Sequence, residues 1–443
     1  MPGRDGSVVV GSGGRGADFY LIISNIVQVG VIVHILFLTD NFYPEVNAPA
    51  NRTFEHCREW VKKGHEVTVV TCVPNFPKGE VFPGYRNRLW QEEKLDGIRV
   101  IRVWTYITAN KGTILRALDY LSFMFSSVIA SAFVRSPDVV VGTSPQFFTA
   151  VSGYLVGLSR SIPFVFELRD LWPESIRAVG VMRSDSLSYS ALTRLELFLY
   201  RRARLIVTVT NAFASNLVNR SIDGNKIRVI TNGVDLTRFQ PVQRDASLVQ
   251  QYGLADKFVV GYIGTHGMAH ALETVLDAAD IVSRSVLGGK VAFLFLGNGA
   301  RKEVLRDKAN SLGLQNVVFV DSVGREEVAR YWSLLDASII HLRNDETFRT
   351  VIPSKLFESL AMGVPILHGV PGESADIVKE NEVGLTFDSE SPEGLVENIV
   401  KLVEDESLYE KLRGNCLIAA KKYDRRGLAI KMLDCLESVV GGS

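Results

Sequence analysis

The chain has 443 residues, which is enough for two domains that each bury a full hydrophobic core. Its 49 basic and 49 acidic residues balance, which argues against a partner such as nucleic acid that is held by net charge. The four cysteines form neither a close pair nor a metal-ligand spacing, so we expect reduced, half-buried thiols of a cytoplasmic protein and no metal site.

The first 30 residues differ in composition from the rest of the chain. Residues 1–16 are rich in Gly and Ser, and residues 18–38 are apolar with several polar interruptions. Such a segment can be mistaken for a signal peptide or a membrane span. Because Val31 to Thr39 is needed as the first strand, we predict instead that residues 1–30 are a disordered tail or a mis-annotated start.

A strand, a helix and a second strand are predicted directly after this segment. The apolar run from Val31 to Thr39 is typical of a strand, Pro49 to Lys63 has apolar residues at helical spacing, and Glu66 to Val73 is again strand-like. This order predicts a βαβ unit and therefore a parallel sheet. Ligands of such sheets bind at the carboxyl ends of the strands, which places the loop from Asp40 to Asn47 at a candidate site.

Two further segments of this half are distinctive. Pro74 to Asp96 is predicted to be a long irregular segment, and such loops are often functional. Ala117 to Val134 is apolar with one charge, which predicts a buried helix. The alternative is a helix with one face on a membrane surface, where Tyr120, Phe123 and Phe125 would lie at the interface.

Charged residues follow the strand predicted at Phe164 to Leu168. Arg169 and Asp170 stand directly at its carboxyl end, where side chains are placed for chemistry. The alternative is a cluster of surface ion pairs.

The second half repeats the same rhythm. Residues 235–256 are predicted to be a hinge and linker, and a strand from Phe258 to Ile263 leads through a Gly-rich loop into a helix at about 272–283. Such a loop can bring backbone N–H groups against a diphosphate. It is not a G-x-G-x-x-G loop, so a nicotinamide is not favoured and no cofactor is expected.

The stretch from Val351 to Leu367 predicts a helix start that suits a phosphate. Ser354 is expected to cap the helix, and Gly363 to end it in a left-handed conformation. Lys355 and Glu358 lie three residues apart and share one side of the first turn. A cation and a helix N-terminus, followed by a carboxylate, would suit a sugar nucleotide. The alternative is a surface turn with an ordinary ion pair.

Taken together, these segments resemble family 4 glycosyltransferases, and most of all the bacterial fucosaminyl- and colanic-acid-type enzymes of surface polysaccharide synthesis. The resemblance covers about residues 33–440. The residues that carry it are Phe42 to Arg52, Lys63 to Val67, Arg169 to Ser175, Asn232 to Asp235, Gly264 to Met268, Leu296 to Gly299 and Val351 to Leu367.

The resemblance implies the α/β fold called GT-B, in which two Rossmann-like domains with parallel sheets face each other across a cleft. The expected domains are an acceptor domain at residues 31–240 and a nucleotide-sugar domain at residues 241–422. A final helix at residues 423–443 is expected to cross back to the first domain.

The resemblance also implies transfer of a sugar, with retained anomeric configuration, from a nucleoside-diphosphate sugar to an acceptor. We expect a UDP-sugar donor and a lipid-linked or growing polysaccharide acceptor, as in lipopolysaccharide, O-antigen or capsule synthesis, with possible peripheral contact with the inner membrane. The expected donor-binding residues are Gly264, Thr265, His266, Gly267, Val323, Gly324, Ser354, Lys355, Glu358 and Glu373. The expected catalytic residues are Asp170, Arg169 and Lys355, and the acceptor side comprises Asn47, Ala48 and Arg52.

The chain departs from the family pattern at three places. Arg169 stands where many members have His. The loop after Gly264 has Thr265 and His270 where Arg and Lys are common, so phosphate charge must be met by backbone N–H groups and Lys355, with Arg349 or His266 as a further candidate. Glu358 matches the second of two family glutamates, which holds the ribose, whereas the first falls at Thr350.

Three other functions remain open on the sequence. A sugar-nucleotide epimerase of the same fold would need no acceptor. A non-catalytic nucleotide-sugar-binding subunit would be consistent with the missing glutamate at Thr350. An oxidoreductase is disfavoured by the absence of the nicotinamide fingerprint.

Overall fold

We describe the fold from a computed structural model of the chain. The structure describes residues 32–76, 78–108, 113–174, 186–324 and 326–442. The tail predicted at residues 1–30 lies outside these ranges.

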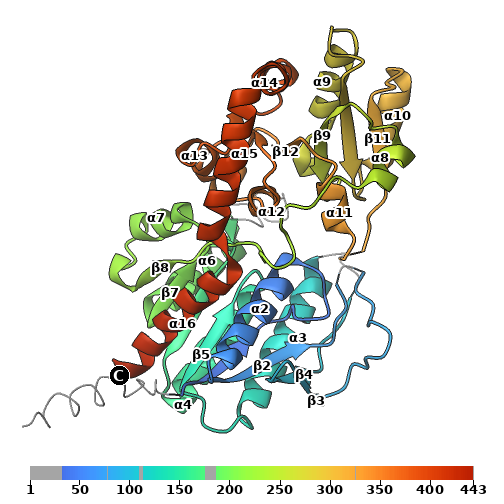
Figure 1. The fold of residues 1–443 in the computed structure, drawn as a ribbon. Helices are drawn as coiled ribbons and strands as arrows, with labels where there is room; N and C mark the ends of the chain where they lie inside the picture. Colours follow the sequence, from blue (N-terminus) through green and yellow to red (C-terminus); the bar gives the residue numbers. More distant parts are fainter. Residues whose placement is uncertain (1–31, 77, 109–112, 175–185, 325, 443) are drawn as a thin grey trace, which may run out of the picture. The chain divides into compact units, whose positions relative to one another are not determined.

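An eight-stranded sheet forms the first half of the chain, in the order β3-β4-β2-β1-β5-β6-β7-β8 (Figure 1). All described pairs in it are parallel except β3 with β4. Its strands are β1 (His34–Leu38), β2 (Glu66–Cys72), β3 (Trp90–Leu95), β4 (Ile98–Val103), β5 (Val139–Thr143), β6 (Phe164–Leu168), β7 (Leu205–Thr208) and β8 (Ile227–Val229). Strand β5 is buried along its whole length, as expected for a parallel sheet covered on both faces.

Strand β3 corrects the prediction of one long irregular segment from Pro74 to Asp96. It runs antiparallel to β4, with Leu95 opposite Ile98, so that Asp96 and Gly97 form a two-residue turn. Both turn residues have positive φ, 47° and 86°. An Asp-Gly pair is a strong hairpin signal, and it could have identified this strand from the sequence.

Five helices accompany this sheet in the described residues: α2 (Ala48–Lys62), α3 (Thr113–Ser131), α4 (Phe147–Arg160), α6 (Leu187–Arg202) and α7 (Asn211–Asn219). The apolar segment predicted as a helix is α3. Its side chains differ in exposure, because Phe123 is buried whereas Phe125 is 61% exposed. Among the described helices, none is long and apolar enough to cross a membrane.

A six-stranded parallel sheet forms the second half, in the order β11-β10-β9-β12-β13-β14. Its strands are β9 (Phe258–Ile263), β10 (Val291–Leu296), β11 (Val317–Val320), β12 (Ala337–His341), β13 (Ile366–Gly369) and β14 (Gly384–Thr386). The helices of this half are α8 (Ala246–Tyr252), α9 (Glu273–Ser283), α10 (Lys302–Ser311), α11 (Val328–Trp332), α12 (Lys355–Met362), α13 (Glu373–Glu380), α14 (Pro392–Glu404) and α15 (Glu406–Ala420). Two parallel α/β sheets are the architecture that the sequence predicted.

Helix α8 lies within the segment predicted to be only a hinge and linker. Asp245 caps it by accepting a hydrogen bond from the Leu248 N–H at 3.1 Å, and Gly253 ends it at φ 65°. An Asp and a Gly at these two positions are ordinary helix boundaries, so the helix was readable from the sequence.

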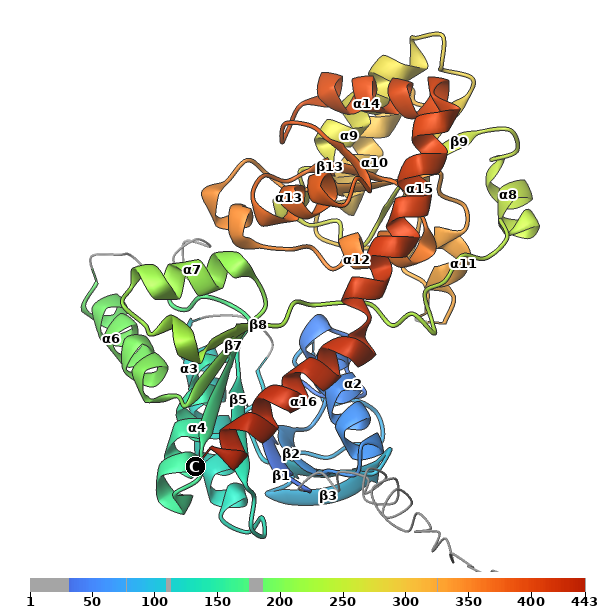
Figure 2. The same ribbon diagram turned by 60° about the vertical axis from the view of Figure 1, so that its left-hand side comes forward.

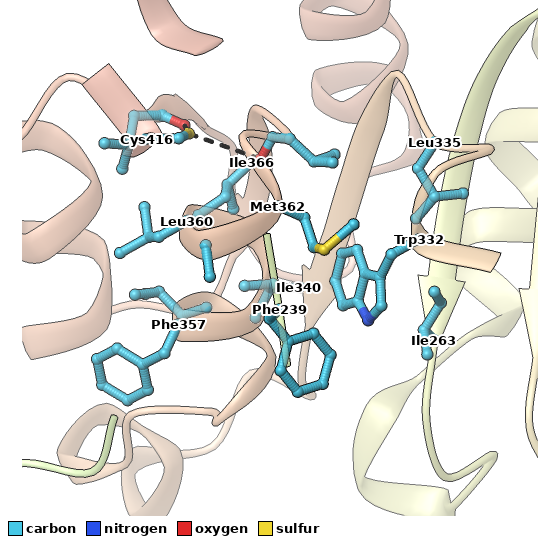
Figure 3. Close-up of a cluster of buried hydrophobic side chains, with 14 of the residues drawn as sticks. Phe239, Ile263, Trp332, Leu335, Ile340, Phe357, Leu360, Met362, Ile366 and Cys416 are labelled. Atoms are coloured by element: carbon cyan, nitrogen blue, oxygen red, sulfur yellow. Dashed lines mark hydrogen bonds between the residues drawn. The ribbon is translucent and has the colours of Figure 1, made fainter. Parts of the chain in front are cut away.

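Helix α12 is held by a large apolar cluster in the second half (Figure 3). Leu356, Phe357 and Leu360 are fully buried on one side of the helix, and Trp332 and Phe239 belong to the same cluster. The buried side of α12 therefore holds the polar residues of its first turn, Lys355 and Glu358, in fixed positions.

The final helix, α16 (Arg425–Gly441), lies alongside α2 of the first half in both ribbon views (Figures 1 and 2). The Trp60 indole N–H donates to the Ala429 carbonyl at 2.8 Å. Met432 and Leu436 of α16 are buried in the same cluster as Trp60. The predicted domain boundaries at residues 240 and 422 stay predictions.

Cysteine burial is deeper than the sequence suggested. Cys57, Cys72 and Cys416 are buried and Cys435 is partly buried, and all four are free thiols. Burial raises the pKa of the Cys57 and Cys72 thiols well above the usual value, so these thiols are unreactive at neutral pH.

Candidate functional site

Three hollows lie at the carboxyl ends of the strands. We call the first the Gly264 hollow, and it has a volume of about 350 Å³. Loops after β9, β10 and β11 form its floor, and residues from the first half and from α16 complete it. Its lining comprises Val46, Asn51, Arg238, Phe239, Ile263, Gly264, Thr265, Leu296, Gly297, Asn298, Ser322, Val323, Gly324, Val328, Glu358 and Arg425.

Five of the predicted donor residues meet in this one hollow. Gly264 and Thr265 follow β9, Val323 and Gly324 follow β11, and Glu358 projects from α12. Because these positions are up to 94 residues apart in the chain, their meeting reflects the parallel order of the strands, which brings all their carboxyl ends to one edge.

Lys355 contacts the Gly264 loop from α12. Its ammonium donates to the Tyr262 hydroxyl at 3.0 Å and lies 4.4 Å from the Tyr262 ring centroid. A Cβ atom on Gly264 would come within 2.2 Å of the Lys355 Cε atom, and Gly264 has φ +146°. Burial lowers the pKa of Lys355 to about 8, so the side chain is a partly desolvated cation near neutral pH.

A second hollow, the His270 hollow, has a volume of about 300 Å³. Lys355, Ser354 and His270 are among its lining residues. Ser354 occupies the N-cap position of α12, but its hydroxyl makes no capping hydrogen bond, which corrects the predicted cap. Gly363 ends α12 at φ 67°, as predicted.

Among the described lining residues of the Gly264 hollow, Glu358 is the one carboxylate. Burial raises its pKa, whereas Arg425, Lys355 and Arg238 favour its charged form. Arg238 and Arg425 line the same hollow, and the sequence analysis did not identify either of them. Arg425 is the first residue of the helix that was predicted to cross back to the first domain. That predicted crossing could have identified Arg425 as a residue near the cleft.

Arg425 also ties α16 to the first half. Its Nε donates to the Gly233 carbonyl at 2.7 Å, and its Nη1 donates to the Glu55 carboxylate at 2.7 Å. The guanidinium therefore has a fixed place in the wall of the Gly264 hollow.

His266 cannot supply the positive charge that was suggested for it. Its ring is buried, and burial together with the charges of Lys302 and Lys355 lowers its pKa to about 4. Its backbone N–H donates to the Asn298 carbonyl at 3.0 Å. The Gly264 N–H likewise donates to Leu296, so two backbone groups of the predicted phosphate loop already have partners. Gly267, also predicted in this loop, precedes a short turn at Met268–His270.

Glu373, which is predicted to bind the donor, does not line the three hollows, and its role in donor binding stays a prediction. Its carboxylate accepts hydrogen bonds from the backbone N–H groups of Asn211 at 2.8 Å and Ala212 at 2.7 Å. These groups begin α7, so Glu373 joins the second half of the chain to a helix terminus of the first.

The third hollow, the Asp40 hollow, belongs to the first half and has a volume of about 280 Å³. Among the predicted acceptor residues, Asn47 lines it. The Asn47 side chain also caps α2 by accepting from the Ala50 N–H at 2.8 Å. Ala48 is exposed at the start of α2 and is not part of the lining.

Arg52 has a structural position rather than the predicted one on the acceptor side. Its side chain is buried, and its Nε donates to Glu167 at 2.9 Å. Its two terminal nitrogens donate to the carbonyls of Thr231 and Ile230, at 2.6 and 3.0 Å. With these bonds made, Arg52 stabilises the loop after β8.

Arg169 and Asp170 lie directly after β6, as predicted, although neither lines the three hollows. The Ser144 hydroxyl oxygen accepts from both of their backbone N–H groups, at 2.7 and 3.2 Å. Burial lowers the pKa of Arg169 to about 10, and the Glu167 carboxylate opposes that shift. Within the described residues, the Arg169 Nε and Nη1 atoms are buried without a hydrogen-bond partner, so this guanidinium still has N–H groups that could donate to an anion.

Two protein-family descriptions match most of the chain. Residues 47–233 match the glycosyl transferase 4-like domain, and residues 246–419 match glycosyl transferases group 1. WcaI of Escherichia coli (strain K12), named as a colanic acid biosynthesis glycosyl transferase, is 25% identical over 74% of this chain and 81% of its own length. A GDP-mannose-dependent alpha-mannosyltransferase of Mycobacterium tuberculosis is 23% identical over 85% of this chain and 90% of its own.

Solved structures share the fold at low sequence identity. Sucrose-phosphate synthase from Thermosynechococcus elongatus superimposes with a TM-score of 0.73 at 15% identity, over 93% of this chain and all of the other. Anabaena HepE in complex with UDP-glucose gives a TM-score of 0.67 at 16% identity, over 91% of this chain and 99% of the other.

Proposed function

This chain belongs to the family 4 glycosyltransferases of GT-B fold, and we propose that its donor is a UDP-sugar bound at the Gly264 hollow. The observation that carries the proposal is the meeting of Gly264, Val323 and Glu358 in one hollow, with Lys355 against its floor. The sugar passes, with retained configuration, to a lipid-linked or growing surface polysaccharide. The UDP-glucose complex of Anabaena HepE, which has the same fold, supports the choice of nucleotide.

Charge placement explains how the site would promote transfer. Negative charge grows on the leaving diphosphate in the transition state, and a cation fixed beforehand lowers the barrier without reorganising. Lys355 is held by Tyr262, and Arg425 is held by Glu55 and the Gly233 carbonyl. Glu358 would accept hydrogen bonds from the ribose hydroxyls while the neighbouring cations keep it ionised.

The acceptor side of the proposal rests on the first half of the chain. Asp170 and Arg169 stand at the carboxyl end of β6, and Asn47 lines the Asp40 hollow. In the part of the chain that the structure describes, Arg169 has buried N–H donors without partners, which suits an anionic part of the sugar donor or of the acceptor. The relative named for colanic acid biosynthesis supports a surface polysaccharide as the product.

Peripheral membrane contact from the cytoplasmic side is part of the proposal. On α3 and just beyond it, Phe125, Ile129 and Phe133 are 61%, 63% and 71% exposed.

Helices α3, α4 and α6 carry two acidic residues, Asp119 and Glu196, neither of them exposed. The same helices carry five arginines: Arg116, Arg160, Arg194, Arg201 and Arg202. An exposed apolar stripe next to Arg160, which donates to the Ser131 and Ala132 carbonyls, suits an anionic lipid surface. Phe123 is buried and Tyr120 lines the Asp40 hollow, so these two residues are not part of this face.

Calorimetry with UDP, GDP and NAD tests the donor site. We expect UDP to bind, and Lys355→Ala and Glu358→Ala each to weaken binding by roughly 10- to 100-fold, because each removes a charged partner. Lys411→Ala and Glu410→Ala are matched controls, since both side chains are exposed on α15. Binding of GDP alone would correct the nucleotide, and binding of NAD alone would contradict the proposal.

The reaction products then distinguish a transferase from an epimerase and from a non-catalytic subunit. A transferase releases UDP faster when a membrane extract containing acceptor is added. A sugar-nucleotide epimerase would convert the donor without an acceptor, and a non-catalytic subunit would bind UDP without converting any donor.

A further inference from the structure

The Asp40 hollow is a second built site, separate from the residues that would hold the donor. It lies at the carboxyl ends of β1, β2, β4 and β5, with α3 on one side. Its lining comprises Asp40, Asn41, Glu45, Asn47, Pro49, Cys72, Asn75, Phe76, Thr105, Thr108, Asp119, Tyr120, Phe123, Pro145 and Gln146. At about 280 Å³ it is at the small end of ligand pockets, which suits one sugar ring.

Three carboxylates define the charge of this hollow. Burial raises the pKa of Asp40 to about 7, and it raises the pKa values of Glu45 and Asp119 as well. The charges of Glu45 and Asp119 raise the pKa of Asp40 further, so the three groups act on one another. Arg102 opposes the pKa shift of Glu45, and Arg116 opposes that of Asp119, so both cations favour the charged carboxylates. In their charged forms the three groups would repel an anion that enters the hollow and attract hydrogen-bond donors.

Much of the remaining wall is fixed and neutral. Thr105 and Gln146 are buried, with Thr105 donating to Asp119 at 2.9 Å and Gln146 capping α4 through the Thr149 N–H at 2.7 Å. Phe76 and Tyr120 add aromatic rings beside the carboxylates. Polar acceptors beside apolar ring faces match the two kinds of surface that a sugar presents, its hydroxyl groups and its C–H faces.

The hollow also shares a wall with the Gly264 hollow. Val46 lines the Gly264 hollow, while its chain neighbours Glu45 and Asn47 line the Asp40 hollow. A ligand in the Asp40 hollow would therefore lie next to the loop that borders the donor site.

We propose that the Asp40 hollow binds the acceptor's terminal sugar ring, and that this ring is an uncharged or amino sugar rather than a uronic acid or a phosphorylated sugar. The inference rests on the proposed transferase function and narrows its acceptor. Asp40 and Asp119 are binding residues that select by charge, and the three carboxylates together disfavour an anionic ring.

Saturation-transfer NMR with simple glycosides tests this selection. The probes are methyl glucoside, methyl glucosaminide and methyl glucuronide, added to the full chain saturated with UDP. We expect the first two to bind at least about tenfold more tightly than the glucuronide, because one close charge repulsion costs about that factor. In Asp40→Asn and Asp119→Asn, this preference should fall below about threefold, and in the control Glu92→Gln, on the exposed edge strand β3, it should not change.

The outcomes separate this inference from the proposed function. If UDP binds but the glucuronide binds as tightly as the glucoside, or none of the three glycosides binds, the inference is wrong and the donor site stands. An unchanged preference in both Asp variants would also overturn it. If UDP itself does not bind, the proposed function fails. Should the Asp variants not fold, the comparison of probes on the unmodified chain still decides.

Discussion

The two halves of the molecule place opposite kinds of side chain at the same position of the same architecture. The loop after β1 contributes Asp40 and Glu45 to the Asp40 hollow, and helix α3 adds the third carboxylate, Asp119. Loops at the carboxyl ends of the second sheet leave small residues at Gly264 and Gly297, with cations around them. A parallel sheet thus determines where a site forms, whereas loop residues determine which charge that site accepts.

The largest expected effect comes from filling the small-residue floor of the Gly264 hollow. Gly264→Ala adds a Cβ atom 2.2 Å from the Lys355 Cε atom at a strained φ, so the Lys355 side chain must move away. We expect UDP affinity to fall by roughly 100-fold in calorimetry while the chain stays folded, because a charged contact is lost.

Gly253→Ala is the matched control for this substitution. Gly253 also has a positive φ, 65°, but its added Cβ atom would meet no neighbour. Equal affinity losses in the two variants would mean that backbone strain, and not Lys355, is responsible.

The second-largest expected effect is on membrane binding, which we expect from the outer surface of the first half and not from that of the second. The double variant Phe125→Ser/Ile129→Ser removes two exposed apolar side chains from α3. We expect binding to anionic lipid vesicles to fall by roughly 20-fold in sedimentation, because the apolar area that enters the lipid is lost. Val286→Ser, at an 89% exposed position in the second half, should not change binding. Unchanged vesicle binding by the double variant would remove the membrane contact from the proposal.

A pH dependence follows from the burial of Lys355. The pKa of its ammonium is about 8, so the cation is present at pH 7 and is lost as the pH rises through 8. Since a diphosphate binds the charged form, UDP affinity should fall by up to about tenfold between pH 7 and pH 9. Lys355→Arg keeps its charge in this range and should flatten the profile. The same decline in the Arg variant would assign the titration to another group.

The smallest effect concerns the contact between the halves. Glu373→Ala removes the carboxylate that accepts from the first N–H groups of α7, and we expect a loss of about 1 kcal/mol of stability in denaturant unfolding. Glu380→Ala is the control, because Glu380 is exposed at the other end of α13, the helix that begins at Glu373. If Glu373 instead holds the donor sugar, the variant will weaken UDP-sugar binding while leaving UDP binding unchanged.

Local patterns predicted the helices and strands well where the signal was hydrophobic periodicity. Strands β1 and β9 were placed to within a few residues, because short continuous apolar runs bounded by turn residues are typical of buried strands. Strand β3 was missed because its residues are polar and only the Asp96–Gly97 turn marks it. Helix α8 was missed because its capping residues were read as part of a linker.

The site residues divide in the same way. Gly264 and Glu358 were found because one follows a predicted strand and the other stands in the first turn of a predicted helix, whereas Val323 was predicted from the family resemblance. Arg52 and Glu373 were assigned to ligands, yet both are used by the protein itself, as a buried ion pair and as a helix cap. Such partners lie 115 and 161 residues away in the chain, and no local pattern contains them.

The sequence by itself determined the two mainly parallel sheets and the edge at which sites form, and it predicted five of the residues that line the Gly264 hollow. The tertiary structure decided which charges gather at each site. Arg425 reaches the Gly264 hollow because α16 packs on α2, and Asp119 joins Asp40 because α3 covers the ends of four strands. The physical reason is that periodicity is a local property of the chain, whereas the charge of a site is a sum over elements that meet only after folding.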